Sequence, residues 1–500
     1  MMLLSSDFAT RRQSIEGLQH ESEKSDSPFR FQGDLRRRKF APHERGRQMI
    51  NPLLTLAEVA HDWRNHPLED DVRWATRRAV LDWFATTVPG CVRAPATMLA
   101  PAMAEVEGSG GAWSYVDARA SSPRRAAFLN AVASHTVEFD DIYKDGGYHP
   151  GSPTIAAALA LAQHLDSNLE DLHRAIVAGY EVGCRISLAI QPSHYKFWHT
   201  TSTVGTIGSA VAGAMLLGCD KVSIANAIAL STSFAGGHQQ NLQGEGMAKA
   251  LHPGHAADAG LIAAIAASAG VRGSPDSLHA ANGFAAVTSD TTGNWASALD
   301  GLGTWTPITR MTVKAHGCCG HIFPALDAIG VMRDKHGFGP ADIERIEVWG
   351  YHATQAMCDR PDPVSAQDAR FSLQYCLAAY LFLGGVRLLA FEQETLARPD
   401  IRALMTRIGL SEDPVLSAGY PRRRQARLRV HLGDGRVLEH FQMTRRGDPE
   451  DPIDDGDLLA KFRELSSGIV ASQDAESIVA TILYGNDLPG KLRLDRRLTR

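Results

Sequence analysis

The sequence predicts a mainly α-helical protein, with a large all-helical domain and a smaller α+β lid domain inserted late in the chain. Apolar residues recur at helical spacing from Asn51 to about Asp300. After Trp305 the pattern changes, and short segments alternate between apolar and polar residues as strands do. Helical spacing then returns beyond the acidic segment 448–457, so the chain ends in the domain where it began.

The composition is that of an ordinary globular chain, with 44% hydrophobic and 21% charged residues. Such a chain is neither disordered throughout nor a small disulfide scaffold. The net charge of −5 gives no basic field for nucleic acid. The uncharged stretch 200–219 is rich in Thr, Ser, Gly and Ala, which favours a buried helix over a membrane span. The seven cysteines form no CxxC pair, so we expect reduced thiols in a cytoplasmic protein.

Residues 1–48 differ from the rest of the chain. They contain ten Lys and Arg against seven Asp and Glu, and they lack apolar residues at helical spacing. Such a segment cannot bury enough apolar surface to offset the entropy of ordering, so it is predicted to be a disordered extension.

The helical domain is predicted to begin with an amphipathic helix. Leu53, Leu56 and Val59 share one face, and Thr55 is its candidate N-cap. A second helix follows around residues 79–84. The next five predicted helices are rich in Ala and Gly, which permit close helix packing: 154–164, 171–190, 204–217, 221–235 and 256–269.

The lid is predicted to contain a strand at 343–349 and a hairpin. The hairpin strands, 427–432 and 436–441, flank a Gly-Asp-Gly turn. A helix at 371–383 lies between these elements, and two more helices follow the lid at 458–465 and 475–483. The predicted boundaries are therefore 49–303 and 448–500 for the helical domain and 304–447 for the lid.

Nucleotide-binding, zincin and α/β-hydrolase motifs are absent from the sequence. Instead, titratable residues lie within Gly-rich, otherwise apolar segments, and buried charges require partners or a function. These residues are Asp140, Asp141, His149, His199, Lys249 and Lys314. Taken singly, each has a structural alternative, such as an acidic pair at a helix end, a core histidine, a surface lysine or a lysine at a hinge.

A metal site is a further alternative. His316, Cys318, Cys319 and His321 lie close together in the sequence, but zinc ligands are usually spaced further apart. We therefore predict that the protein binds no metal.

Several segments occur in an order that resembles the MmgE/PrpD family, over about residues 51–483. They read AAFLNAVASHTVEFDD, HPG, WHTTSTVGTIGSAVAGAMLLG, GMAKALHPGHAADAG, VKAHGCCGHIFPALDAI and ARFSLQYCLAAYL. That family includes 2-methylcitrate dehydratase, cis-aconitate decarboxylase and iminodisuccinate epimerase. The resemblance implies a homodimer without metal or organic cofactor, and an active site in the cleft between the helical domain and the lid.

The resemblance also implies roles for individual residues. Those expected to be catalytic are His149, His199, Lys249 and Tyr375, and those expected to bind substrate are Lys314, Asp140, Asp141 and Thr201. Two segments depart from the family pattern, the loop 142–148 and the stretch 316–319. The Cys-Cys pair in the second is closer to fungal cis-aconitate decarboxylases.

These residue types suit a small polycarboxylate substrate. Lysines bind carboxylates through charge-assisted hydrogen bonds, and histidines transfer protons near neutral pH. The resemblance favours a 2-methylcitrate dehydratase-like hydro-lyase, and we expect no partners among nucleic acids or membranes. A decarboxylase, an epimerase and, from another class, a non-catalytic acid-binding helical protein stay open as alternatives.

Overall fold

The computed structural model describes residues 51–104, 108–242, 246–491 and 494. The predicted disordered extension, residues 1–48, lies outside the described residues. The prediction of a mainly α-helical protein is confirmed. None of the described helices is both long and apolar enough to cross a membrane.

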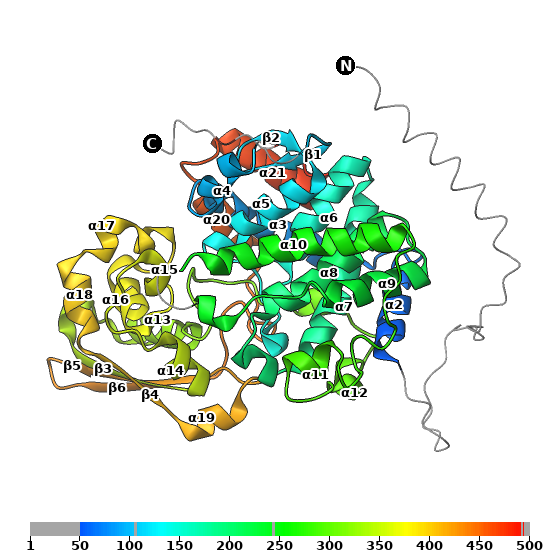
Figure 1. Cartoon of the computed structure of the whole chain (residues 1–500). Coiled ribbons are helices and arrows are strands. Elements are labelled where there is room, and N and C mark those ends of the chain that lie inside the picture. The colour runs from blue at the N-terminus through cyan, green and yellow to red at the C-terminus, as the bar shows by residue number, and fades with distance from the viewer. Residues whose placement is uncertain (1–50, 105–107, 243–245, 492–493, 495–500) are drawn as a thin grey trace, which may run out of the picture. The chain divides into compact units, whose positions relative to one another are not determined.

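The first part of the described chain is almost entirely helical (Figure 1). Its helices are α2 (Pro52–Asp62), α3 (Asp70–Gly90), α4 (Ala96–Ala102), α5 (Pro123–Thr136), α6 (Gly151–Leu165), α7 (Leu169–Ile190), α8 (Thr200–Leu216), α9 (Lys221–Thr232), α10 (Ala248–Ser268), α11 (Phe284–Thr288) and α12 (Trp295–Ala298). A short antiparallel hairpin, β1 (Ala112–Ser114) and β2 (Arg119–Ser121), precedes α5. The N-cap of α2 is Asn51 rather than the predicted Thr55, because the Asn51 side chain accepts from the amides of Leu53 and Leu54.

Small residues let α7, α8 and α10 approach one another closely. A Cβ atom on Gly179 of α7 would lie 2.7 Å from the carbonyl oxygen of Gly208 in α8. A Cβ atom on Gly260 of α10 would lie 2.7 Å from the carbonyl oxygen of Thr206. The stretch 200–219 therefore forms a buried helix among other helices, as its composition predicted.

Helix α10 begins eight residues before the predicted start at residue 256. Pro253 and Gly254 indicate a helix break, yet both lie inside α10. Gly254 faces α5, where an added Cβ would lie 3.0 Å from the Phe128 carbonyl oxygen, so tertiary packing overrides local propensity. As a consequence, Lys249 lies in the first turn of a helix rather than in a loop between two breaks.

The C-terminal helices α20 (Asp455–Ser466) and α21 (Ser472–Tyr484) return to α3, far away in sequence (Figure 1). The Lys461 ammonium donates to Asp82 on α3, at 2.6 Å, and to the Phe139 carbonyl, at 2.7 Å. The Arg77 guanidinium donates to the Ile482 carbonyl at 2.7 Å. We call α2–α12, α20 and α21 the helical region.

Residues 318–442 form a separate mixed region, which we call the α+β region. Its helices are α13 (Phe323–His336), α14 (His352–Cys358), α15 (Ala366–Ala369), α16 (Leu373–Leu383), α17 (Gln393–Leu396), α18 (Pro399–Met405) and α19 (Pro414–Gly419). Its strands are β3 (Ile343–Gly350), β4 (Ile408–Glu412), β5 (Ala426–Leu432) and β6 (Val437–Gln442), in the order β4-β3-β5-β6. Strand β3 is parallel to β4 and antiparallel to β5, and β5 and β6 form the predicted hairpin.

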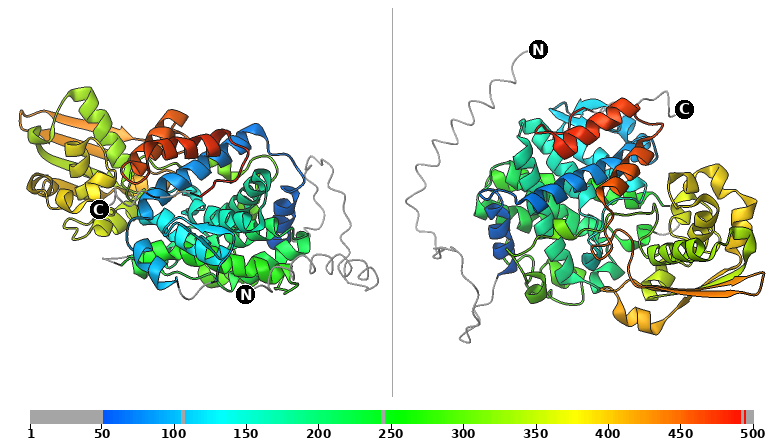
Figure 2. Two further views of the ribbon diagram at one scale, coloured as in Figure 1. Left: turned by 90° about the horizontal axis from the view of Figure 1, so that it is seen from above. Right: turned by 180° about the vertical axis from the view of Figure 1, so that it is seen from behind.

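One face of this sheet is buried. Alternate residues of β5 are buried, and α13 and α16 contact the sheet (Figure 2). Buried apolar residues of the α+β region form one cluster, and those of segments 53–308 and 453–483 form another. The assignment of these clusters to a helical domain and a lid that moves as a unit stays a prediction.

Candidate active site

A narrow cavity lies where the helical region meets the α+β region. Its wall is formed by Glu138, Ile142, Gly147, His149, Tyr195, Lys249, Lys314, Cys319, Gly320, His321, Phe371, Tyr420 and Arg424. Its free volume of about 40 Å³ accommodates only a few water molecules. A larger cavity of about 310 Å³ lies beside α21, but no histidine lines it. We therefore treat the narrow cavity as the candidate active site.

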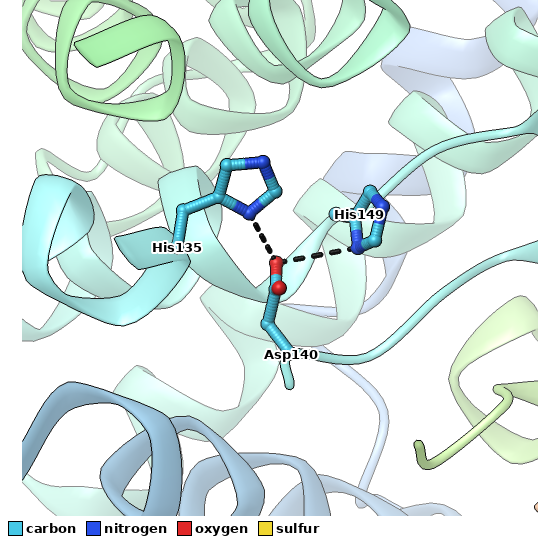
Figure 3. A group of neighbouring side chains, drawn as sticks. All are labelled: His135, Asp140 and His149. Carbon is cyan, nitrogen blue, oxygen red and sulfur yellow. Dashed lines mark hydrogen bonds and ion pairs between the residues drawn. The ribbon is translucent and has the colours of Figure 1, made fainter. Parts of the chain in front are cut away.

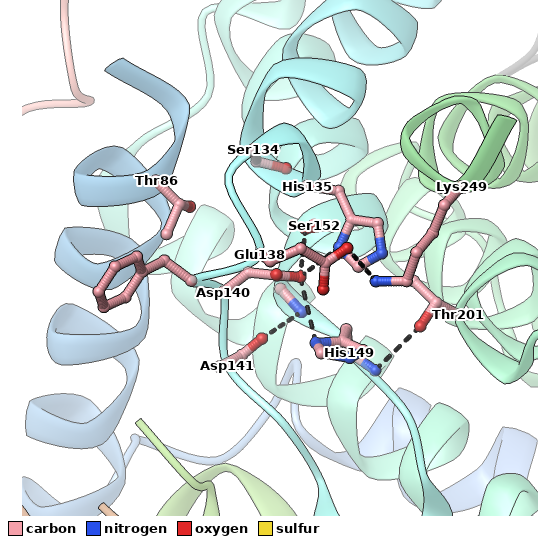
Figure 4. Close-up of polar contacts among 12 residues, drawn as sticks. Thr86, Ser134, His135, Glu138, Asp140, Asp141, His149, Ser152, Thr201 and Lys249 are labelled. Atoms are coloured by element: carbon pink, nitrogen blue, oxygen red, sulfur yellow. Dashed lines mark hydrogen bonds and ion pairs between the residues drawn. The ribbon is translucent and has the colours of Figure 1, made fainter. Parts of the chain in front are cut away.

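Two lysines contact Glu138, a residue that sequence reasoning missed, and Figure 4 shows one of them, Lys249. Lys249 donates to the Glu138 carboxylate, and Lys314 donates to the Glu138 carbonyl oxygen at 2.8 Å. Burial raises the pKa of Glu138, but the two lysines outweigh burial and hold it well below its ordinary value. Glu138 also has a φ of 58°, which is uncommon outside glycine and is concentrated at functional sites. The feature of the sequence that could have identified Glu138 is its position in the quoted segment VEFDD, two residues before Asp140.

Asp140 holds two histidines together (Figure 3). Its Oδ2 accepts from His135 Nδ1 at 2.7 Å and from the Ser152 hydroxyl at 2.8 Å, and it lies 3.3 Å from His149 Nδ1. Burial raises the pKa of Asp140, but the two histidines hold it well below its ordinary value. Asp140 is buried and does not line the cavity, so in the structure it positions His149 and His135 rather than facing a substrate.

His149 is the histidine of the predicted set that lines the cavity. Its backbone amide donates to the Thr201 hydroxyl at 3.2 Å, which fixes the start of α6 against α8. Thr201 itself is absent from the cavity wall. Burial lowers the pKa of His149 to about 4 despite the nearby Asp140 carboxylate. His149 is therefore neutral at pH 7, and with Nδ1 directed at Asp140 its free ring nitrogen is Nε2.

His199 is buried outside the cavity wall. Its Nδ1 is 2.9 Å from Nδ1 of His252, its ring centroid is 5.6 Å from that of His135, and it does not line the cavity. Burial, with Lys249 close by, keeps the pKa of His199 well below its ordinary value. Sequence reasoning missed His252 as well, although it lies in the quoted segment ALHPGH.

Asp141 and Tyr375 are not brought to the cavity. The Asp141 carboxylate accepts from the Gly151 amide at 3.0 Å and from the Tyr180 hydroxyl at 2.8 Å, so it anchors the start of α6. The Tyr375 hydroxyl donates to the Ala390 carbonyl inside the α+β region. In this structure both residues make contacts within the fold, and the substrate contact predicted for Asp141 and the catalytic role predicted for Tyr375 stay predictions.

Asp141→Asn should stabilise the protein more at pH 8 than at pH 5. Burial raises the pKa of Asp141 to about 7, whereas an unfolded chain has about 3.9. A raised carboxyl pKa favours the folded state at low pH, and this contribution is lost as pH rises from about 4 to 7. The amide does not titrate, so its advantage should grow by about 2–3 kcal/mol between the two pH values.

Urea unfolding at both pH values measures this difference. The control is Asp290→Asn, because the Asp290 side chain is exposed. An Asp141→Asn advantage that is equal at pH 5 and pH 8 would contradict the assignment.

A metal ion is a chemical alternative for the group in Figure 3. One atom from each of His135, Asp140 and His149 lies within 4.8 Å of the others, and two imidazoles with a carboxylate suit several divalent metals. An ionised carboxylate accounts for the same geometry without a metal, because Asp140 Oδ2 can accept an N–H from His135 and lies 3.3 Å from His149 Nδ1. The metal site considered from the sequence, around His316 and His321, is not brought together in the structure. His316 contacts Asp327 at 3.2 Å, whereas His321 contacts the Tyr351 hydroxyl at 2.7 Å.

Turnover should survive exhaustive chelation within about twofold if protons hold this group. The measurement is the steady-state rate before and after dialysis against EDTA, with metal content determined by mass spectrometry. A loss of turnover that one divalent metal restores would instead assign His135, Asp140 and His149 as its ligands.

Comparison with known protein families identifies the family of this chain. The models for the MmgE/PrpD N-terminal domain and the MmgE/PrpD C-terminal domain match residues 54–295 and 316–483. The chain belongs to the MmgE/PrpD family. The resemblance predicted from the sequence is therefore confirmed.

Two kinds of enzyme are among its MmgE/PrpD relatives. Human cis-aconitate decarboxylase is 28% identical over 389 residues, which cover 75% of this chain and 79% of that protein. The mouse cis-aconitate decarboxylase is 29% identical over 379 residues, which cover 73% and 76%. A 2-methylcitrate dehydratase from Cupriavidus necator is 24% identical over 341 residues, which cover 63% and 69%.

Proposed function

We propose that the chain is a cofactor-independent lyase that acts on a small di- or tricarboxylic acid. The charge of the cavity wall carries the proposal, because Lys249, Lys314 and Arg424 face a single wall carboxylate, Glu138. This excess of two positive charges suits a polyanion, and the neutral imidazole of His149 lies in the same wall. Family membership supports the proposal.

The same residues serve two kinds of bond cleavage. In dehydration, a base removes the proton α to a carboxylate, the C–O bond breaks, and the hydroxyl leaves as water with a proton from an acid. In decarboxylation, a C–C bond breaks, carbon dioxide leaves, and the electron pair stays on carbon until a proton arrives. Both reactions build negative charge next to a carboxylate, which Lys249 and Lys314 would stabilise.

We rank decarboxylation of a cis-aconitate-like acid first and dehydration of a 2-methylcitrate-like acid second. The family resemblance favoured the hydro-lyase, but the decarboxylases are more similar to this chain, at 28–29% identity against 24% for the dehydratase. Epimerisation needs an acid and a base on opposite faces of one carbon, and of the described histidines the wall holds only His149 and His321. Burial lowers the pKa of both imidazoles, and two nearby arginines add to the effect at His321, so neither is charged in the free protein at pH 7.

Substrate entry requires the cavity to widen, since about 40 Å³ is too small for a tricarboxylate. One contact that closes it joins the two regions, because Arg370 of the α+β region donates to the Val137 carbonyl at 2.7 Å. Lys314, in the segment that connects the regions, donates to the Glu138 carbonyl at 2.8 Å. We expect the α+β region to move away from the helical region as a lid during binding and release. A homodimer and a cytoplasmic location stay predictions.

A proton NMR screen in deuterated buffer tests the proposed function. Purified protein is incubated with cis-aconitate, 2-methylcitrate and related di- and tricarboxylates. New vinyl signals with release of carbon dioxide indicate decarboxylation, and new alkene signals without carbon dioxide indicate dehydration. Loss of a C–H signal without net conversion indicates epimerisation, and binding without any turnover would favour a non-catalytic protein.

A further inference from the structure

Arg424 is a buried cation without a carboxylate partner among the residues that the structure describes. It precedes β5, is only 7% exposed and lines the cavity. One guanidinium nitrogen donates to the Lys144 carbonyl, while Nε is buried without a hydrogen-bond partner. No carboxylate among the described residues lies within 4.0 Å of its nitrogens. A buried charge is costly unless it is paired, so this position calls for an anion.

Other buried cations of the described chain are paired differently. Arg445 pairs with Asp448 at 2.6 Å, and Lys461 pairs with Asp82 at 2.6 Å. Arg370 also lacks a carboxylate, but it donates to two backbone carbonyls and does not line the cavity. Arg424 differs in combining an unpartnered nitrogen with a place in the cavity wall.

The acidic groups around Arg424 are either neutral or already held by other cations. Asp145 interacts electrostatically with Arg424, but it also faces Lys144, and burial raises its pKa. The neighbours of Arg424 in the wall include Tyr420, whose ring centroid lies 5.6 Å from the guanidinium carbon. Burial raises the pKa of Tyr195 and of Tyr351, so both phenols are neutral at physiological pH. The nearby Asp448 carboxylate is already held by Arg445 and by the Thr312 hydroxyl. The one carboxylate of the wall, Glu138, is held by the two lysines.

We propose that Arg424 binds a carboxylate of the substrate that Lys249 and Lys314 do not bind, and that it thereby selects tricarboxylates over dicarboxylates. The guanidinium fork suits bidentate recognition of a carboxylate. Three wall cations match three substrate carboxylates, whereas a dicarboxylate can satisfy both of its charges at the lysines. This inference rests on the proposed function.

Binding of two unreactive probes tests the inference. Tricarballylate carries three carboxylates, and glutarate has the same five-carbon chain without the central one. Isothermal titration calorimetry with the wild-type protein should show at least tenfold tighter binding of tricarballylate. Arg424→Gln should weaken tricarballylate binding about 10- to 100-fold, the range of a charge-assisted hydrogen bond, and glutarate binding less than threefold.

Two further variants complete the experiment. Arg424→Lys keeps the charge without the fork and should fall between the wild-type protein and Arg424→Gln. Arg422→Gln removes an exposed arginine from the same segment and should leave both affinities unchanged. Thermal denaturation of each variant reports whether it folds.

The possible outcomes separate this inference from the proposed function. Equal wild-type affinities for the two probes overturn the Arg424 assignment without reference to any variant. An unchanged preference in Arg424→Gln, or an equal loss for both acids with a lowered Tm, also overturns it and leaves Arg424 as an anchor for Lys144. If the wild-type protein binds neither acid, the proposed function fails, and this inference fails with it.

Discussion

Replacing His149 with Gln should lower kcat on the identified substrate by about 10²- to 10⁴-fold, the range of a general acid or base. His149 lines the cavity, its Nδ1 lies 3.3 Å from Asp140, and burial lowers its pKa to about 4. It is therefore a neutral base in the free protein at pH 7. Glutamine is similar in size and keeps hydrogen-bonding atoms, but it cannot transfer a proton.

The pH dependence of kcat and of kcat/KM should also report the protonation of His149. If His149 is the base of a dehydration, kcat/KM, which reports the free protein, should be constant above about pH 5 and fall towards pH 4 as His149 becomes protonated. A bound polyanion brings negative charge close to the imidazole and raises its pKa. The acid limb of kcat should accordingly lie at a higher pH than that of kcat/KM, and both limbs should disappear in His149→Gln. If His149 instead delivers the proton of a decarboxylation, the rate should fall as pH rises through the pKa of its substrate-bound state.

His173→Gln is the matched control. Burial lowers the pKa of His173 to about 4 as well, but this residue lies on α7 and is not part of the cavity wall. Its replacement should leave kcat within about twofold. If a folded His149→Gln protein also kept its rate, His149 would not be the proton-transfer residue.

The sequence predicted those helices and strands whose apolar residues recur at a clear helical or strand spacing. The strand at 343–349 and the hairpin around residues 433–435 are confirmed, because alternation and turn residues identify both without help from distant contacts. Strand β4 was missed because its five residues, IGLSE, offer only two alternating apolar side chains, too few to predict a strand, and it pairs with β3 alone. The start of α10 was missed because packing against α5 decides it.

The candidate site was predicted in part. His149, Lys249 and Lys314 do line one cavity, although they come from segments up to 165 residues apart. Glu138 and Arg424 were missed because their significance depends on contacts made only after folding. A glutamate beside Asp140 and Asp141 is indistinguishable from a helix-end acid, and the third arginine of PRRR from a surface charge, until burial is known.

Lys249→Met should lower kcat/KM by at least about 10²-fold and should also destabilise the fold. Lys249 forms a buried ion pair with Glu138 on the cavity wall. Removing one partner leaves a buried carboxylate whose remaining cation, Lys314, is 3.7 Å away, and breaking a buried pair costs about 3–5 kcal/mol. The activity falls for a separate reason, because one of the cations that faces the polyanion is lost.

A double variant separates these two effects. Glu138→Gln added to Lys249→Met removes the unpaired charge, so the free energy of unfolding should recover most of the loss, as urea unfolding can measure. If Lys249 binds substrate, kcat/KM should stay low in the double variant even though the fold is restored. Recovery of both quantities together would mean that Lys249 serves only to neutralise Glu138. Comparison of the single and double variants therefore tests whether Lys249 contributes only to the stability of the cavity wall or also to catalysis.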